Sequence, residues 1–174
     1  MPSNRRSYRY VGPNQLHERA KRASGRKCIR SAQDLLEWLD QNGRTTQTLI
    51  ATFIIDTDEQ LWVADRRSEH VVCAGGKEVL AAGEIEFSAS GDRVCILGAT
   101  NQSTGYCPEP DSWPVVDDVL SRLDISHPPG FTAAFIFRRC TGCGSTNVIK
   151  DEVFECAICQ SELSRDWNYH DAGG

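Results

Sequence analysis

The stretch Thr48-Leu-Ile-Ala-Thr-Phe-Ile-Ile55 gives the clearest indication of fold in this sequence. It is rich in β-branched and aromatic residues, which is typical of a buried strand. The polar connection Asp56-Thr-Asp-Glu-Gln60 separates it from a second apolar run, Leu61-Trp-Val-Ala64. The two runs are therefore predicted to form a β-hairpin, and a sheet is expected at the centre of the fold.

Further strand-forming stretches lie on both sides of this hairpin. They are Tyr8–Val11, Val71–Cys73, Val79–Phe87, Arg93–Leu97 and Phe131–Phe137. Their short length and their β-branched and aromatic content favour strands over helices. We expect the longer ones to share one sheet with the first hairpin.

Three segments have helical patterns. The best begins after Ser31, which can cap the helix with Asp34 at the third position, and ends at Gly43. A short polar helix is expected at about 14–22, and another helix from Asp111 or Ser112 to Leu123. Consecutive strands followed by a helix and a strand favour an α+β class, with an antiparallel or mixed sheet and helices packed on it.

Composition narrows the function classes. The chain has 174 residues, of which 40% are hydrophobic and 25% charged, as in ordinary globular proteins. Its apolar stretches are of strand length, so a membrane protein is not expected. The N-terminus lacks the apolar segment of a secretory signal, so a cytoplasmic location is predicted.

Charge is unevenly distributed along the chain. Residues 1–30 carry nine Lys or Arg and one acid, a net charge of +8, whereas the whole chain carries −5. Such a basic segment can contact nucleic-acid phosphates, or it can fold back onto the acidic remainder of the protein. The sequence leaves both interpretations open.

Four of the eight cysteines form one pattern, Cys140-x2-Cys143 and, twelve residues later, Cys156-x2-Cys159. Paired Cys-x2-Cys units in a chain without a secretory signal indicate metal ligands rather than disulfides. Four thiolates suit tetrahedral zinc, and the intervening residues alternate as a β-hairpin does. We therefore predict a C-terminal zinc ribbon with one structural Zn²⁺, because four cysteines leave no position for a catalytic water. The predicted organisation is a basic segment (1–30), an α+β body (31–137) and the ribbon with its tail (138–174).

A second candidate site is the polar loop 101–110, which precedes a helix start. Gly75, Gly76 and Gly83 imply bulges or close backbone approach nearby. The candidate ligand-binding residues are Glu84, Asn101, Ser103, Tyr106 and Cys107. The alternative is a structured turn whose polar side chains satisfy their own backbone. Likewise, Glu84 is either a functional acid or a brace bonded to the amides of residues 101–106.

Residues 61–124 resemble a known module. Ala74-Gly-Gly76, Val79-Leu-Ala-Ala-Gly-Glu84 and Ser103-Thr-Gly-Tyr-Cys-Pro108 are similar to the AGG…AAGE…SGHYRP pattern of plant IQ-motif calmodulin-binding proteins and of bacterial toxin- or effector-like proteins. The closer resemblance is to bacterial proteins that combine this module with a C-terminal ribbon. Thr104, Gly105 and Cys107 replace the Gly, His and Arg of the pattern. Any chemistry of that His and Arg is therefore not implied for this chain, and neither is calmodulin binding.

Three functional hypotheses follow. The first is a zinc-stabilised, non-catalytic binding or adaptor protein that recognises a protein partner or small ligand through loop 101–110. The second is an effector- or toxin-type enzyme with a cleft near Glu84 and Tyr106. The third is a nucleic-acid-binding protein that uses the basic N-terminus and the ribbon.

Overall fold

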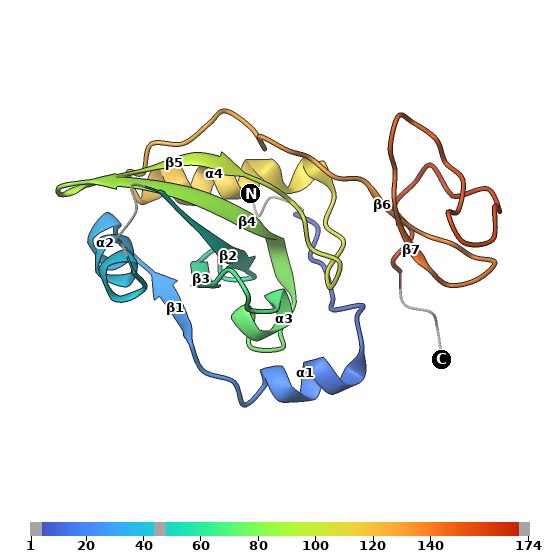
Figure 1. Ribbon diagram of the computed structural model, residues 1–174, viewed down its shortest axis with the longest axis horizontal. Coiled ribbons are helices and arrows are strands. Elements are labelled where there is room, and N and C mark those ends of the chain that lie inside the picture. The colour runs from blue at the N-terminus through green and yellow to red at the C-terminus, as the bar shows by residue number, and fades with distance from the viewer. Residues whose placement is uncertain (1–4, 44–47, 171–174) are drawn as a thin grey trace.

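The computed structural model describes residues 5–43 and 48–170. Its body is built on a five-stranded sheet in the order β1-β3-β2-β4-β5 (Figure 1). The strands are β1 (Arg26–Ile29), β2 (Thr48–Asp56), β3 (Leu61–Asp65), β4 (Val79–Ser90) and β5 (Arg93–Ala99). All neighbouring strands pair antiparallel, and helices pack on the sheet. The predicted α+β class is confirmed.

The predicted β2–β3 hairpin is present, and Asp56 shapes its turn. One carboxylate oxygen of Asp56 accepts from the amides of Asp58 and Gln60 at 3.0 and 2.9 Å. The other accepts from the indole Nε1 of Trp62 at 2.7 Å. An aspartate that satisfies turn amides in this way stabilises a tight connection.

Helix α2 (Ala32–Gln41) begins as the sequence predicts. The hydroxyl of Ser31 accepts from the Asp34 amide at 3.0 Å, and the Asp34 carboxylate accepts from the Arg30 amide at 2.8 Å. The helix stops before Gly43, whose φ of 90° lies in the left-handed region. Helix α4 (Trp113–Arg122) follows a short 3₁₀ turn, η1 (Pro110–Ser112).

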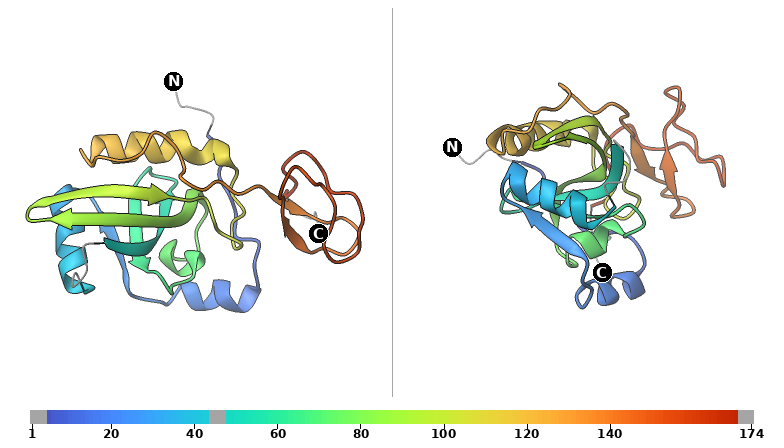
Figure 2. Two further views of the ribbon diagram at one scale, coloured as in Figure 1. Left: turned by 45° about the horizontal axis from the view of Figure 1, so that its top comes forward. Right: turned by 60° about the vertical axis from the view of Figure 1, so that its left-hand side comes forward.

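Helices cover both faces of the sheet (Figure 2). On one face α2 and α4 enclose a core that includes Leu35, Phe53, Phe87 and Leu120. On the other face lie α3 (His70–Cys73), α1 (Asn14–Ala20) and the N-terminal segment. The loop 101–110 packs with this second group, because the Tyr106 ring lies in the same buried cluster.

Three strand predictions are wrong. Residues 8–11 form no strand, and only Tyr8 makes an isolated antiparallel bridge, with Val79. Residues 71–73 lie in helix α3, where Glu69 O accepts from the amides of Val72 and Cys73, and two left-handed glycines follow the helix. Three apolar residues are too few for a periodicity to separate helix from strand. The segment 131–137 does not enter the sheet. It runs along the outer edge of β5, where the Thr132 amide donates to Ala99 O at 2.8 Å.

The C-terminal region forms a separate small unit beside the body (Figure 1). Strands β6 (Phe137–Arg139) and β7 (Thr146–Val148) pair antiparallel at its base. We call residues 138–164 the ribbon and residues 165–170 the tail. The division of the chain at residues 30 and 137 stays a prediction, and β1 shows that residues 26–29 contribute to the body sheet. None of the described helices combines the length and apolarity needed to cross a membrane.

Candidate functional site

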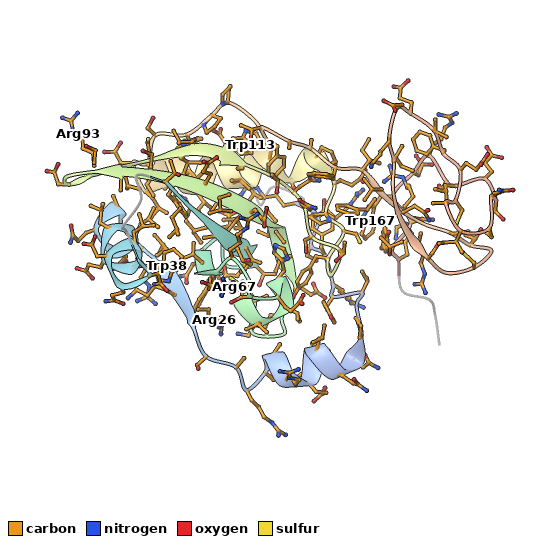
Figure 3. The ribbon with its side chains drawn as sticks, in the orientation of Figure 1. Arg26, Trp38, Arg67, Arg93, Trp113 and Trp167 are labelled. Carbon is orange, nitrogen blue, oxygen red and sulfur yellow. The ribbon has the colours of Figure 1, made fainter. Side chains whose placement is uncertain are left out.

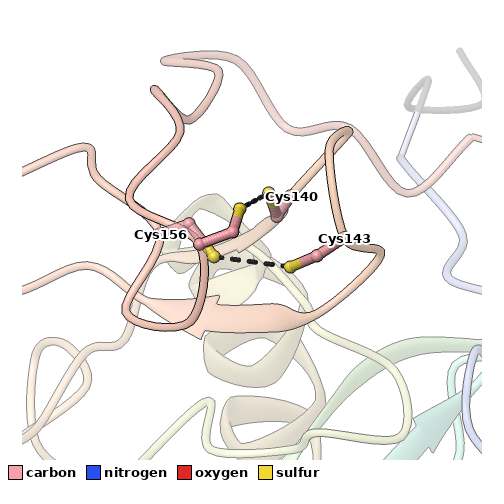
Figure 4. A group of neighbouring side chains, drawn as sticks. Cys140, Cys143 and Cys156 are labelled. Atoms are coloured by element: carbon pink, nitrogen blue, oxygen red, sulfur yellow. Dashed lines mark hydrogen bonds between the residues drawn. The ribbon is translucent and has the colours of Figure 1, made fainter.

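The four cysteines of the ribbon converge on one point. Their sulfur atoms all lie within 4.8 Å of one another. Cys140 Sγ is 3.5 Å from Cys159 Sγ, and Cys143 Sγ is 3.6 Å from Cys156 Sγ (Figure 4). A tetrahedral ion with metal–sulfur bonds of about 2.3 Å holds its sulfurs about 3.8 Å apart. The four thiols therefore fit a tetrahedral metal ion.

The two halves of the site repeat one backbone turn. In each Cys-x2-Cys unit the amide of the first cysteine donates to the carbonyl of a serine five residues later, at 2.8 Å from Cys140 to Ser145 and 2.9 Å from Cys156 to Ser161. Gly144 closes the first turn with a φ of 75°, a conformation that glycine adopts without strain. Each turn thereby contributes two sulfurs to the cluster of four.

The same serines also support the sulfurs. Ser145 Oγ lies 3.1 Å from Cys143 Sγ and 3.3 Å from Cys156 Sγ, and Ser161 Oγ lies 3.2 Å from Cys159 Sγ. Hydrogen bonds lower the pKa of Cys156, first that from the Ser145 hydroxyl and then those from the backbone amides of Cys159 and Ile158. The pKa of Cys159 is lowered in the same way, first by the Ser161 hydroxyl. These partners orient the ligands and stabilise their anionic form. We did not predict them, although the repeated spacing Cys-x2-Cys-x-Ser is visible in the sequence.

Within the described residues, only the four cysteines make up this ligand group. Cys140 and Cys156 are buried with Leu163, whereas Cys143 and Cys159 are exposed at the outer side. A set of four protein ligands is typical of structural rather than catalytic metal sites. The apolar cluster beside these cysteines is small, with Leu163 as its other buried member.

The loop 101–110 is built around Asn101, which is completely buried. Its side-chain amide donates to Pro108 O at 2.9 Å and to Phe135 O at 2.7 Å, while its carbonyl accepts from the Phe135 amide at 2.7 Å. Tyr106 is also completely buried, and its hydroxyl donates to Lys77 O at 2.7 Å. These contacts correspond to the structured-turn interpretation. A ligand-binding role for Asn101 and Tyr106 stays a prediction.

Ser103 and Cys107 lie in the interior of the same loop. Both are at most 1% exposed, and the Cys107 amide donates to Ser103 O at 2.7 Å. Cys107 has a φ of 48°, a left-handed conformation that is uncommon for a residue other than glycine. Burial raises the pKa of the Cys107 thiol to about 11. Within the loop 101–110, Gln102 and Thr104 are the exposed residues.

Glu84 lies on the sheet face that Tyr106 covers, but the two side chains do not share a polar contact. The Glu84 carboxylate is 3.6 Å from Arg66 Nε and is about one-third exposed. The connection to the loop is made by the backbone: the Glu84 amide donates to Thr100 Oγ1 and Glu84 O accepts from the Thr100 amide. The predicted brace by the carboxylate is thus replaced by a backbone brace.

Part of the basic N-terminal segment folds back onto the body. Arg5 forms ion pairs with Glu59 and Asp118, and Arg9 pairs with Glu78 at 2.7 Å. For Arg5 and Arg9, these contacts match the interpretation that the segment folds back onto the acidic remainder of the protein.

In comparisons with known proteins, the chain matches no family, no curated protein and no solved structure.

Proposed function

We propose that this chain is a zinc-stabilised, non-catalytic binding or adaptor protein, and that its ribbon presents the surface that contacts a protein partner. The observation that carries this proposal is the position of exposed apolar side chains. Among the described residues, four large hydrophobic side chains are exposed, and three of them lie in the ribbon: Val148 (40%), Val153 (59%) and Ile158 (74%). Exposed apolar side chains concentrated on so small a unit favour an interaction surface.

The donor set supports zinc as the metal. Four thiolates with serine hydroxyls beside them form a soft, closed, tetrahedral environment, which zinc occupies in ribbons of this spacing. Cys140, Cys143, Cys156 and Cys159 would hold the ion. Its contribution is structural, because it replaces the large apolar core that 27 residues do not provide.

Charge favours a protein over a nucleic acid as the partner of the ribbon. Residues 138–164 carry three basic and four acidic side chains. Four thiolates on one divalent ion add two further negative charges. Nucleic-acid-binding surfaces neutralise phosphates with clustered Lys and Arg, and the ribbon has no such excess.

The burial of candidate nucleophiles and bases supports the non-catalytic part of the proposal. Cys73 and Cys107 are completely buried, and burial raises the pKa of both thiols. His70 Nε2 lies 2.9 Å from Gly83 O, so its ring is engaged with the backbone. Candidate nucleophiles and bases need access to a substrate.

A photo-crosslinking amino acid tests the proposal. It is placed at Ile158 of the ribbon, at Gln102 of the exposed part of the loop, or at Arg67 of the body as a matched exposed control. Crosslinks to one protein in the producing cells from position 158, and none from position 67, are expected. Adducts from position 102 alone would assign recognition to the loop, and no adducts from either position would contradict the adaptor function.

A parallel binding assay addresses the nucleic-acid alternative. Fluorescence anisotropy is measured with single-stranded and duplex DNA at about 50 mM and about 200 mM salt. The account predicts no binding at either salt concentration. Affinity that falls by about a thousandfold or more over this range would favour the basic-segment hypothesis instead.

A further inference from the structure

The tail joins the ribbon to the body. Trp167 lies between the two units (Figure 3). Its indole Nε1 donates to Cys107 O at 2.8 Å, and its ring meets the edge of Tyr8 with centroids 5.6 Å apart. Tyr169 is 6% exposed and packs in one buried cluster with Cys107 and Phe137. The tail therefore covers loop 101–110 at Cys107.

The position of the tail depends on the ribbon. The Asn168 side chain donates to Arg139 O at 2.7 Å and accepts from the Arg139 amide at 2.8 Å, which adds the tail to the end of β6. The guanidinium of Arg138 donates to Arg165 O at 2.8 Å. Strand β6 ends at Arg139, immediately before Cys140. The strand that anchors the tail is thus continuous with the first metal ligand.

We propose that the metal-bound ribbon is a latch that masks the Cys107 thiol, and that release of the metal frees the tail and uncovers this thiol. The inference rests on the proposed function, because it requires a metal in the ribbon. Without the metal, the chain between Arg138 and Arg165 becomes a flexible loop, and closing that loop costs entropy that the ordered ribbon does not incur. The tail then leaves the body, and solvent reaches the backbone and side chain of Cys107.

The reactivity of Cys107 follows from this geometry. In the latched state the thiol lies 3.4 Å from Thr104 O and is inaccessible. Its raised pKa keeps it in the unreactive thiol form. Exposure to water removes the desolvation that raises the pKa, so the uncovered thiol ionises and reacts more readily.

Cys73 provides a matched internal control. It is as buried as Cys107, and burial raises its pKa to about 12. It lies in α3, in a cluster with Ile54 and Tyr106. Trp167 of the tail packs against the outside of this cluster, but neither the ribbon nor the tail contributes one of its buried members. Release of the latch should leave Cys73 masked, whereas unfolding of the body would expose both thiols.

The experiment is site-resolved alkylation of the full chain with a maleimide, with the metal content measured on the same sample. Tandem mass spectrometry locates the alkylated cysteines. After chelation of the metal, we expect Cys107 to react at least about tenfold faster and Cys73 to react at an unchanged rate. If the purified protein contains metal but chelation leaves the alkylation rate of Cys107 unchanged, or raises that of Cys73 by the same factor, the latch is overturned and the proposed function is not. A protein without metal would overturn the proposed function as well.

A variant tests the latch while the metal stays bound. Trp167→Ala removes the bond to Cys107 O and the contact with Tyr8 but no ligand. It is expected to accelerate Cys107 alkylation with one metal retained per chain. Lys150→Ala, an exposed ribbon change, is the control and should leave the rate unchanged. Slow alkylation of Cys107 in Trp167→Ala would contradict the role of the tail.

Discussion

Arg138 and Glu109 form an ion pair that joins the base of the ribbon to the end of loop 101–110. Arg138 Nη1 donates to Glu109 Oε1 at 2.7 Å, and the two side chains are 5% and 16% exposed. The guanidinium also donates to Phe137 O and Arg165 O. One buried cation thus connects the body, β6 and the tail.

Removing this cation should destabilise the protein. Arg138→Ala leaves the Glu109 carboxylate without its partner in a buried position, and such a loss costs about 3–5 kcal/mol of unfolding free energy. Urea unfolding followed by tryptophan fluorescence measures the change. The control is Arg9→Ala, because Arg9 and Glu78 are 64% and 39% exposed and their pair should contribute less than about 1 kcal/mol. Equal effects of the two substitutions would contradict the buried ion pair.

Asn101→Ala tests the internal brace of the loop. The substitution leaves the Phe135 amide and the carbonyls of Phe135 and Pro108 without a partner in the interior. A loss of at least about 2 kcal/mol in unfolding free energy is expected, since each unsatisfied buried group costs about 1–3 kcal/mol. Gln102→Ala changes the exposed neighbour and should have little effect. A stable Asn101→Ala protein that no longer binds its partner would instead support a direct binding role.

Gly83→Ala tests the close approach of β4 to the start of the loop. A Cβ atom at this position would lie 1.8 Å from the backbone oxygen of Thr100, the residue whose amide donates to Glu84 O. Strand β4 and the chain at Thr100 must separate to admit it, so we expect severe destabilisation or no folded protein. Gly130→Ala has open space around it and serves as the control. Unfolding curves that coincide for the two variants would show that the two segments are farther apart.

The pH dependence of stability should report on His70. Burial lowers the pKa of His70 below its ordinary value of 6.5, so the folded protein keeps the ring neutral while the unfolded chain binds a proton below that pH. The contribution of the neutral ring is complete above about pH 6.5 and is lost as the pH falls, by at most about 1.4 kcal/mol per pH unit.

His70→Gln should therefore reduce this slope. Unfolding free energies are compared from about pH 7.5 to about pH 5.5 for the wild type, His70→Gln and the exposed-site control His170→Gln. The ribbon titrates equally in all three, so a difference in slope belongs to His70. Parallel curves for the wild type and His70→Gln would exclude a depressed pKa.

Local chemistry made parts of the fold predictable. The β2–β3 hairpin, the cap of α2 by Ser31 and the four-cysteine group depend on residues close in sequence, so spacing and residue type were sufficient to identify them. Gly83 also marked a close backbone approach, although its neighbour, Thr100, could not be named in advance. Such features need no knowledge of distant contacts.

The missed features depend on distant partners. The charges of Arg26 and Lys27 predict that residues 26–29 belong to the basic segment. In the structure these residues form β1, and the guanidinium carbon of Arg26 lies 4.1 Å from the ring centroid of Trp62. Asn101 has a polar side chain of the kind that binds ligands, but its partner Phe135 lies 34 residues farther along the chain. A polar side chain looks the same in sequence whether it bonds to a ligand or to a distant backbone.

The most direct test of the account is the metal content of the full chain purified without chelator, measured by native mass spectrometry and elemental analysis. One zinc per chain is predicted, with loss of the metal in Cys156→Ser and retention in Cys95→Ser, which changes a cysteine outside the ligand group. A folded wild-type protein without zinc would contradict the central claim, and so would a Cys156→Ser protein that still contains zinc.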